Sequence, residues 1–221
     1  MKPILFNAEM TKAILDGRKT VTRRVVKPCP ISHLRHIEDG TKYGYWMDGN
    51  CQPFKPRYRP GDILYVRETW ASNAQGGYFY KADGHNEVFT WQPSIHMPKE
   101  AARLFLRVTY VRVERLQEIT VEGILQEGVS DIEPPPVCKN RPQFPDGFDK
   151  WSKERQDDWL RSTARGTYIG WLDYADNIMR AFKAIWDSTI KPADRDRYGW
   201  EANPWVWGIE FERITKEEAT E

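Results

Sequence analysis

The sequence predicts an α+β fold, mostly β, in which a small mixed barrel carries helices on its outside. Segments with the two-residue alternation of strands outnumber segments with helical periodicity, and the two kinds do not alternate regularly along the chain. That order excludes a doubly wound parallel sheet. In residues 104–116 the apolar positions change phase between Val108 and Val111, which indicates a bulge or sharp bend of the kind that helps to close a small barrel.

The 221 residues are enough for one large domain or two small ones, and a content of 40% hydrophobic and 13% aromatic residues suits a globular protein with a core. The net charge of +1 gives no overall field that would attract a polyanion, so a nucleic-acid contact requires a local basic patch. The three cysteines have no framework spacing, and no apolar run has the length of a signal peptide or a membrane span. We therefore expect a cytoplasmic protein without disulfides and without a membrane partner.

The N-terminal elements are a short strand at residues 4–6 and a helix that Asn7 caps. Gly17 then provides a left-handed stop for the helix. A strand is expected at residues 20–26, with Thr22 and Arg24 on one face and Val21, Arg23 and Val25 on the other.

The middle of the chain begins with a Pro- and Gly-rich excursion, residues 27–60, that includes a hairpin near residues 43–47. A strong strand is expected at residues 63–70 and a shorter one at 78–81, followed by a rigid loop at 91–98.

The C-terminal half contains a short helix, which Thr120 caps and which ends at Glu127 and Gly128. The composition then changes, and residues 130–167 are interpreted as an insertion or peripheral lobe of a single domain that covers residues 1–214. A helix with a continuous apolar stripe from Leu172 to Trp186 precedes the last strand, and residues 215–221 form a charged tail that we expect to be frayed.

Residues 14–24 (ILDGRKTVTRR) concentrate cationic and hydroxyl side chains directly after the helix stop. Lys19 and Thr22 have opposite phases in a regular strand, so they converge only if the chain is still turning after Gly17. The plainer interpretation is a solvated strand edge, because lysines commonly guard such edges. Glu127 opposes the helix dipole, and Gly123 one turn earlier is expected to leave open space beneath its side chain.

Three stretches carry a family resemblance, namely residues 14–24, residues 60–70 (PGDILYVRETW) and residues 203–211 (NPWVWGIEF). Together they resemble the ASCH family, a branch of the PUA-like superfamily. The order of the three stretches, the loop at residues 94–98 and the element at residues 126–128 (QEG) resemble a phage- and prophage-borne subgroup. The resemblance covers most of the chain except residues 130–167. It implies a pseudo-barrel of PUA-like type, with a cleft between barrel and helices that suits RNA or a nucleoside.

A small bacterial member of this family is an N-acetylcytidine amidohydrolase. The resemblance therefore implies that Lys19, Thr22 and Glu127 are catalytic residues, the last matched through the pair Gln126-Glu127. Binding residues are expected among the neighbouring cations, strand residues and loop aromatics, namely Arg18, Thr20, Arg23, Arg24, Arg67, Glu68, Trp70, Trp91 and His96. Glu68 also suits a buried partner of an arginine, and Trp70 also suits the core.

Amide hydrolysis needs a nucleophile, a base and a proton donor for the leaving amine. Thr22 suits the nucleophile, with Lys19 as its base if burial or neighbouring cations lower the lysine pKa. In the alternative, Glu127 activates a water and Lys19 stabilises the oxyanion. The sequence leaves both schemes open.

We thus expect a protein that binds RNA or a modified nucleoside and hydrolyses the amide of N-acetylcytidine or a related acylated base. The alternatives are a non-enzymatic module that reads RNA or a modified base and a metal-independent ribonuclease. We expect no cofactor and no metal, since Cys29, His33, His36 and Cys51 fit no strong zinc spacing. The expected assembly is a monomer or weak dimer.

Overall fold

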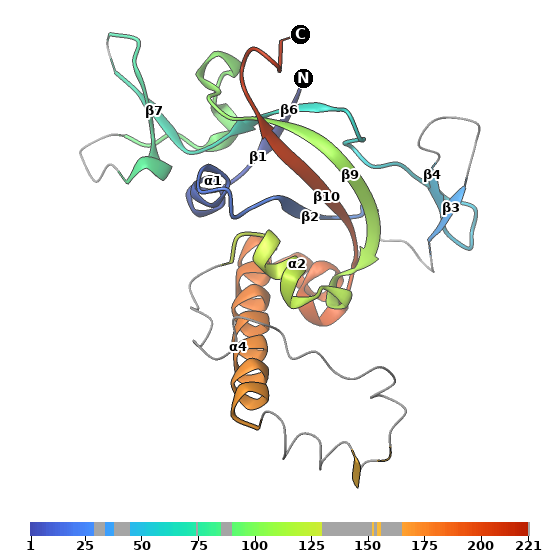
Figure 1. Ribbon diagram of the computed structural model, residues 1–221. Helices are drawn as coiled ribbons and strands as arrows, with labels where there is room; N and C mark the ends of the chain where they lie inside the picture. The colour runs from blue at the N-terminus through green and yellow to red at the C-terminus, as the bar shows by residue number, and fades with distance from the viewer. Residues whose placement is uncertain are drawn as a thin grey trace.

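A five-stranded sheet with helices packed against it forms the body of the protein in the computed structural model (Figure 1). The structure describes residues 1–28, 34–37, 45–73, 75–84, 90–129, 152, 154–155 and 165–220, with side chains from Tyr174 onward in the last range. The predicted lobe at residues 130–167 falls almost wholly outside these ranges, as do Cys29, His33 and Cys138. The expectation of an α+β fold that is mostly β is confirmed.

The main sheet has the strand order β1-β6-β9-β10-β2. Its members are β1 (Lys2–Leu5), β6 (Ile63–Arg67), β9 (Phe105–Arg115), β10 (Trp205–Ile214) and β2 (Val21–Val25). Strand β1 runs parallel to β6, and the other neighbours are antiparallel. The described strands do not close into a barrel, so β1 and β2 are the two edges of an open sheet.

The two edges nevertheless approach each other, because the long strands β9 and β10 bend together (Figure 1). The pairing of these strands shifts between Glu210 and Phe211, which pair with Tyr110 and Val108 and so leave Thr109 as an extra residue. The predicted phase change at this point is therefore a β-bulge. Across the resulting seam, Arg24 Nη2 of β2 donates a 2.7 Å hydrogen bond to the Leu5 carbonyl of β1.

Smaller elements extend from this body. The remaining strands are β3 (Arg35–Ile37), β4 (Tyr45–Met47), β5 (Pro53–Phe54), β7 (Trp70–Ser72) and β8 (Tyr78–Tyr80). Strand β4 is the middle of a three-stranded sheet, which agrees with a hairpin in this region, and β7 pairs with β8. The α-helices are α1 (Ala8–Leu15), α2 (Val121–Gln126), α4 (Arg165–Thr189) and α5 (Arg195–Tyr198).

The strand predicted over residues 63–70 is wrong in its second half. Strand β6 ends at Arg67, and Trp70 begins β7 after a two-residue break. The break has a physical reason, since the backbone changes partners after Arg67: Glu68 N donates to Met97 Sδ, and Trp70 pairs with Gln92 and Tyr80. The buried Glu68 carboxylate binds the Arg103 guanidinium at 2.9 Å and 3.0 Å.

The core lies on both faces of the sheet, because successive side chains of β10 point to opposite faces. Trp205, Trp207 and Ile209 pack in a cluster with α1 and the sheet strands, whereas Val206 packs on the opposite face against Ile178 of α4. The apolar stripe of α4 is confirmed at Ile178, Phe182 and Trp186, which are buried in the second cluster. The tail was predicted to be frayed, but Ala219 is buried against a third cluster and the Thr215 hydroxyl accepts from the Glu218 amide.

Two helix ends meet at the start of β2. Gly17 after α1 and Gly128 after α2 both have the left-handed φ that stops a helix, +73° and +88°. The intervening backbone is tied to both helices, since Lys19 N donates to the Ala13 carbonyl and Thr20 N donates to the Gln126 carbonyl. The chain is thus still turning at Lys19, as convergence of Lys19 with Thr22 requires.

The two glycines make a matched pair for mutation. A Cβ at Gly17 meets nothing within 4 Å, whereas one at Gly128 lies 2.7 Å from Ala13 Cβ and 3.0 Å from Lys19 Cβ. Gly17→Ala should lower the free energy of unfolding by about 1–2 kcal/mol from backbone strain alone. Gly128→Ala should lower the free energy of unfolding by the same strain term and by a further ~1–3 kcal/mol, because its new methyl group overpacks the site. Denaturant unfolding of both variants measures the difference, and equal costs would contradict the close packing at Gly128.

Candidate functional site

A buried ion pair joins the two helix ends. Lys19 Nζ lies 2.5 Å from Glu127 Oε2, and the lysine side chain has no exposed surface. The ammonium also donates to the Val21 carbonyl at 2.9 Å and to the Glu127 carbonyl at 3.0 Å. Three acceptors therefore engage all three protons of the ammonium, which compensates the desolvation of the charge.

Burial lowers the pKa of Lys19 below its ordinary value. The charge of Glu127 and its hydrogen bond oppose this shift, and the charges of Arg24 and Arg23 add to it. The group is thus an ammonium that releases a proton more readily than an exposed lysine does, at a position in contact with one carboxylate.

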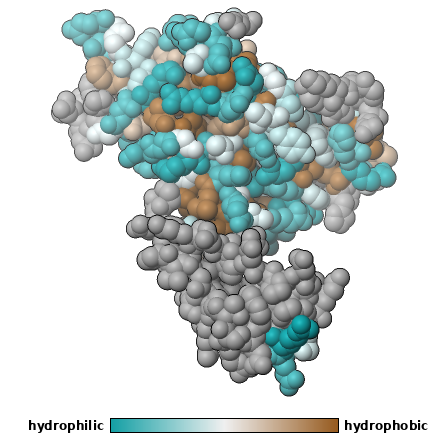
Figure 2. All heavy atoms as spheres, in the orientation of Figure 1, coloured by the Kyte–Doolittle hydropathy of each residue, from teal (hydrophilic) through white to brown (hydrophobic). Residues whose placement is uncertain are grey.

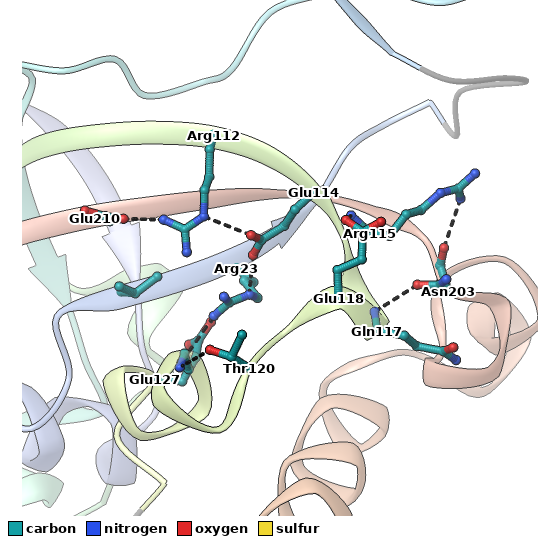
Figure 3. A network of polar contacts seen from close by, with 12 residues as sticks. Arg23, Arg112, Glu114, Arg115, Gln117, Glu118, Thr120, Glu127, Asn203 and Glu210 are labelled. Atoms are coloured by element: carbon teal, nitrogen blue, oxygen red, sulfur yellow. Dashed lines mark hydrogen bonds and ion pairs between the residues drawn. The ribbon is translucent and has the colours of Figure 1, made fainter. Parts of the chain in front are cut away.

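Glu127 is held from its other side by an arginine. Arg23 Nη1 lies 3.3 Å from Glu127 Oε1, while Arg23 Nε donates to Glu114 Oε1 at 2.7 Å. Arg112 Nε then binds Glu114 Oε2 at 2.8 Å, and the second arm of Arg112 binds Glu210 (Figure 3). These residues form an ion-pair chain of six alternating charges that runs from Lys19 to Glu210.

Two glycines make room for this chain. The backbone register places Gly208 opposite both Arg23 and Arg112, and a Cβ there would lie 3.2 Å from the Arg112 side chain. A Cβ on Gly123 would lie 3.0 Å from Arg23 Nη2. The expectation of open space at Gly123 is therefore wrong, because the Arg23 guanidinium fills it.

Thr22 and Glu127 border one cavity of about 290 Å³, which we call the Thr22 cavity. It lies at the outer edge of β2, where α1 and the C-terminal part of α4 approach. Figure 2 shows a patch of apolar surface just below the sheet, where α4 meets it in the orientation of Figure 1. The lining combines the three cations Arg18, Arg23 and Arg24 with apolar side chains and polar groups, namely Asn7, Glu9, Met10, Ala13, Gly128, Val129, Phe182, Ile185, Trp186, Ser188 and Thr189.

The position of β2 explains how residues of opposite strand phase share this cavity. Thr22 and Arg24 lie on one face of β2 and Arg23 on the other, as predicted. Because β2 is an edge strand, both faces are accessible from its free side. The Thr22 side chain is almost wholly buried and makes no hydrogen bond with the described residues, so its hydroxyl is available to a ligand.

The structure thus brings together six of the predicted site residues. Thr22, Glu127, Arg18, Arg23 and Arg24 line the cavity, and Lys19 lies behind Glu127. The interpretation as a solvated edge is wrong for Lys19 and Arg23, which are 2% and 5% exposed. Thr20 is exposed, and its backbone links β2 to Gln126 and Phe211.

The other predicted binding residues do not line this cavity. Glu68 is the buried partner of Arg103, and Trp70 lies in the third core cluster. Arg67 donates to the Ile95 carbonyl in the 91–98 loop, where Trp91 and His96 also lie.

Sequence reasoning missed two groups of residues. Arg112 and Glu114 are two apart on β9 and so share a face, but only the strand register shows that this face meets Arg23. The apolar wall from α4 was predicted as core, yet Ile185 is 37% exposed and borders the cavity.

The described residues contain no cluster of three side chains suited to a metal ion, and no helix among them is long and apolar enough to cross a bilayer. No protein-family pattern, curated protein or solved structure matches the chain.

The ion pair gives a direct stability test. Lys19→Met preserves volume but leaves Glu127 without its buried ammonium, so it should lower the free energy of unfolding by about 3–5 kcal/mol. Adding Glu127→Gln should restore part of that loss, because it removes a buried charge that is then left with Arg23 as its ion-pair partner among the described residues. Lys12→Met on the exposed side of α1 is the control and should change stability by no more than about 0.5 kcal/mol. Similar denaturant midpoints for Lys19→Met and Lys12→Met would contradict the pairing.

Proposed function

We propose that this protein is an ASCH-type, PUA-like protein that hydrolyses the amide of N-acetylcytidine or a related acylated base bound in the Thr22 cavity. The proposal is carried by one observation, the placement of the Thr22 hydroxyl and the Glu127 carboxylate on the same cavity with Lys19 directly behind the carboxylate. The proposed pseudo-barrel is supported by the bent β9–β10 pair and by the Arg24–Leu5 contact between the edge strands.

The contacts favour Glu127 over Lys19 as the base. A base needs a lone pair that faces the reacting proton, and the Lys19 ammonium has all three protons engaged and no exposed surface. Glu127 retains contact with the cavity while Lys19 and Arg23 hold one oxygen each. Lys19 then orients the carboxylate and keeps it ionised, so that it can accept a proton.

In the proposed reaction, the Thr22 hydroxyl attacks the acetyl carbonyl carbon while Glu127 takes the hydroxyl proton. Collapse of the tetrahedral intermediate breaks the bond to the exocyclic nitrogen, and the same proton passes to the leaving amine. Water then hydrolyses the threonine ester to acetate, which restores the hydroxyl. If water attacks directly, Glu127 plays the same part and Thr22 only binds the substrate.

The test is release of cytidine and acetate from N-acetylcytidine, followed by chromatography. Glu127→Gln should reduce kcat by about 10²-fold or more, the usual worth of a general base. Thr22→Val, which keeps the shape and removes the hydroxyl, should abolish turnover if Thr22 is the nucleophile. Glu122→Gln on the exposed side of α2 and Thr109→Val at the β9 bulge are the matched controls. No cytidine release, or equal release by Glu127→Gln and the wild type, would reject the proposal.

A second function, the binding of RNA without catalysis, is favoured by the complete hydrogen bonding of the Lys19 ammonium. An ammonium with three acceptors is already satisfied, as in a purely structural role, and Arg18 and Arg24 on the cavity suit the binding of RNA without catalysis.

This second function predicts RNA binding that weakens steeply with salt and persists in Thr22→Val. Arg18→Gln combined with Arg24→Gln should weaken binding and flatten its salt dependence, because two phosphate contacts are lost. Fluorescence anisotropy with a short single-stranded RNA measures both. The same RNA analysed on a gel reports cleavage, the result expected of a metal-independent ribonuclease. Binding that is independent of salt would contradict this function.

A further inference from the structure

A second pocket, of about 460 Å³, lies on the other side of Arg24, in the seam between the edge strands β1 and β2. We call it the seam pocket. Its lining contains four cations and no carboxylate, namely Arg24, Lys27, Lys55 and Arg57 beside Ile4, Leu5, Val25, Pro56, Tyr58, Trp207 and Ile209. Such a concentration of positive charge is unlike the rest of a chain whose net charge is +1.

The cations of the seam pocket are held differently from those of the ion-pair chain. Lys27, Lys55 and Arg57 form no ion pair with any described residue, and each lies over an aromatic ring at 4.8 Å to 5.6 Å from its centroid. Lys27, Lys55 and Arg57 are exposed. Their charges are therefore oriented but not neutralised, which is the condition for attracting an anion.

Arg24 connects the two cavities. It lines both of them, and its guanidinium is fixed by the Leu5 carbonyl and lies 5.3 Å from the centre of the Phe6 ring. On the Thr22 side of Arg24, a ligand meets the Thr22 hydroxyl, apolar walls and the charges of Arg18, Arg23 and Glu127, which are held in ion pairs. On the seam side it meets Lys27, Lys55 and Arg57, which have no ion pair with a described residue. That arrangement fits a molecule with an uncharged base at one end and a phosphate at the other.

We propose that the seam pocket binds the phosphate of the substrate, so that the protein acts on a nucleotide or an RNA residue in preference to a free nucleoside. This inference rests on the proposed function for the identity of the base, whereas the phosphate site itself rests on the lining cations. Arg24 and Arg57 carry forked donors that match phosphate oxygens, and Lys27 and Lys55 add point charges around them.

The first experiment compares kcat/KM for N-acetylcytidine, its 5′-monophosphate and a short single-stranded RNA that contains one acetylcytidine. The phosphorylated substrates should be preferred by about tenfold or more. A higher kcat/KM for the monophosphate shows that the pocket binds the phosphate of a free nucleotide. A higher kcat/KM for the RNA alone shows that it binds a phosphate of the RNA backbone. Equal kcat/KM for all three substrates overturns the phosphate site and leaves the proposed hydrolysis standing.

The matched variants separate the pocket from general charge effects. Lys55→Gln with Arg57→Gln should reduce the preference for the phosphorylated substrate about tenfold. Lys81→Gln with Lys99→Gln, which removes two exposed lysines outside both cavities, should leave the preference as in the wild type. A preference unaffected by Lys55→Gln with Arg57→Gln overturns the assignment of the phosphate to this pocket.

Equilibrium binding keeps the inference testable if no substrate is hydrolysed. Calorimetry with cytidine 5′-monophosphate and with cytidine should then show tighter binding of the monophosphate, lost in Lys55→Gln with Arg57→Gln. That outcome supports the seam pocket although the hydrolytic function has failed. Equal affinity for the two ligands overturns the seam pocket.

Discussion

The buried contact between Lys19 and Glu127 is the interaction on which the site depends. It joins two segments 108 residues apart, at the point where α1 and α2 both end in left-handed glycines. A buried ammonium is expensive unless every proton finds an acceptor, and here the carboxylate, the Glu127 carbonyl and the Val21 carbonyl provide three. The pair therefore fixes where Glu127 lies and also where β2 begins.

The alternating chain of ion pairs determines which cations remain available to a ligand. Arg23 and Arg112 are balanced by Glu127, Glu114 and Glu210, and side-chain exposure increases from Arg23 at 2% to Glu210 at 38%. Charges neutralised in this way orient one another but attract little from solution. The cations of the seam pocket differ, because no carboxylate is among the residues lining that pocket.

Local features of this fold could be predicted from the sequence, because they depend on a few neighbouring residues. The Asn7 and Thr120 caps, the glycine stops and the bulge near Thr109 are examples. Features that depend on distant partners could not be predicted. After the break at Arg67 the backbone pairs with Met97 and Gln92, and the space at Gly123 is filled by a guanidinium 100 residues earlier in the chain. The candidate residues were recognised, but their burial and pairing required the register of β2, β9 and β10.

The open sheet accounts for two different cavities around one strand. In a closed barrel β2 would have neighbours on both sides, and Thr22, Arg23 and Arg24 would be divided between the inside and the outside. As an edge strand, β2 instead presents both faces to its free side, and Arg24 reaches across to Leu5 of the opposite edge. One arginine thereby separates a cavity with a hydroxyl and a carboxylate from a pocket of uncompensated cations. A ligand that fills both the Thr22 cavity and the seam pocket therefore needs two chemically different ends.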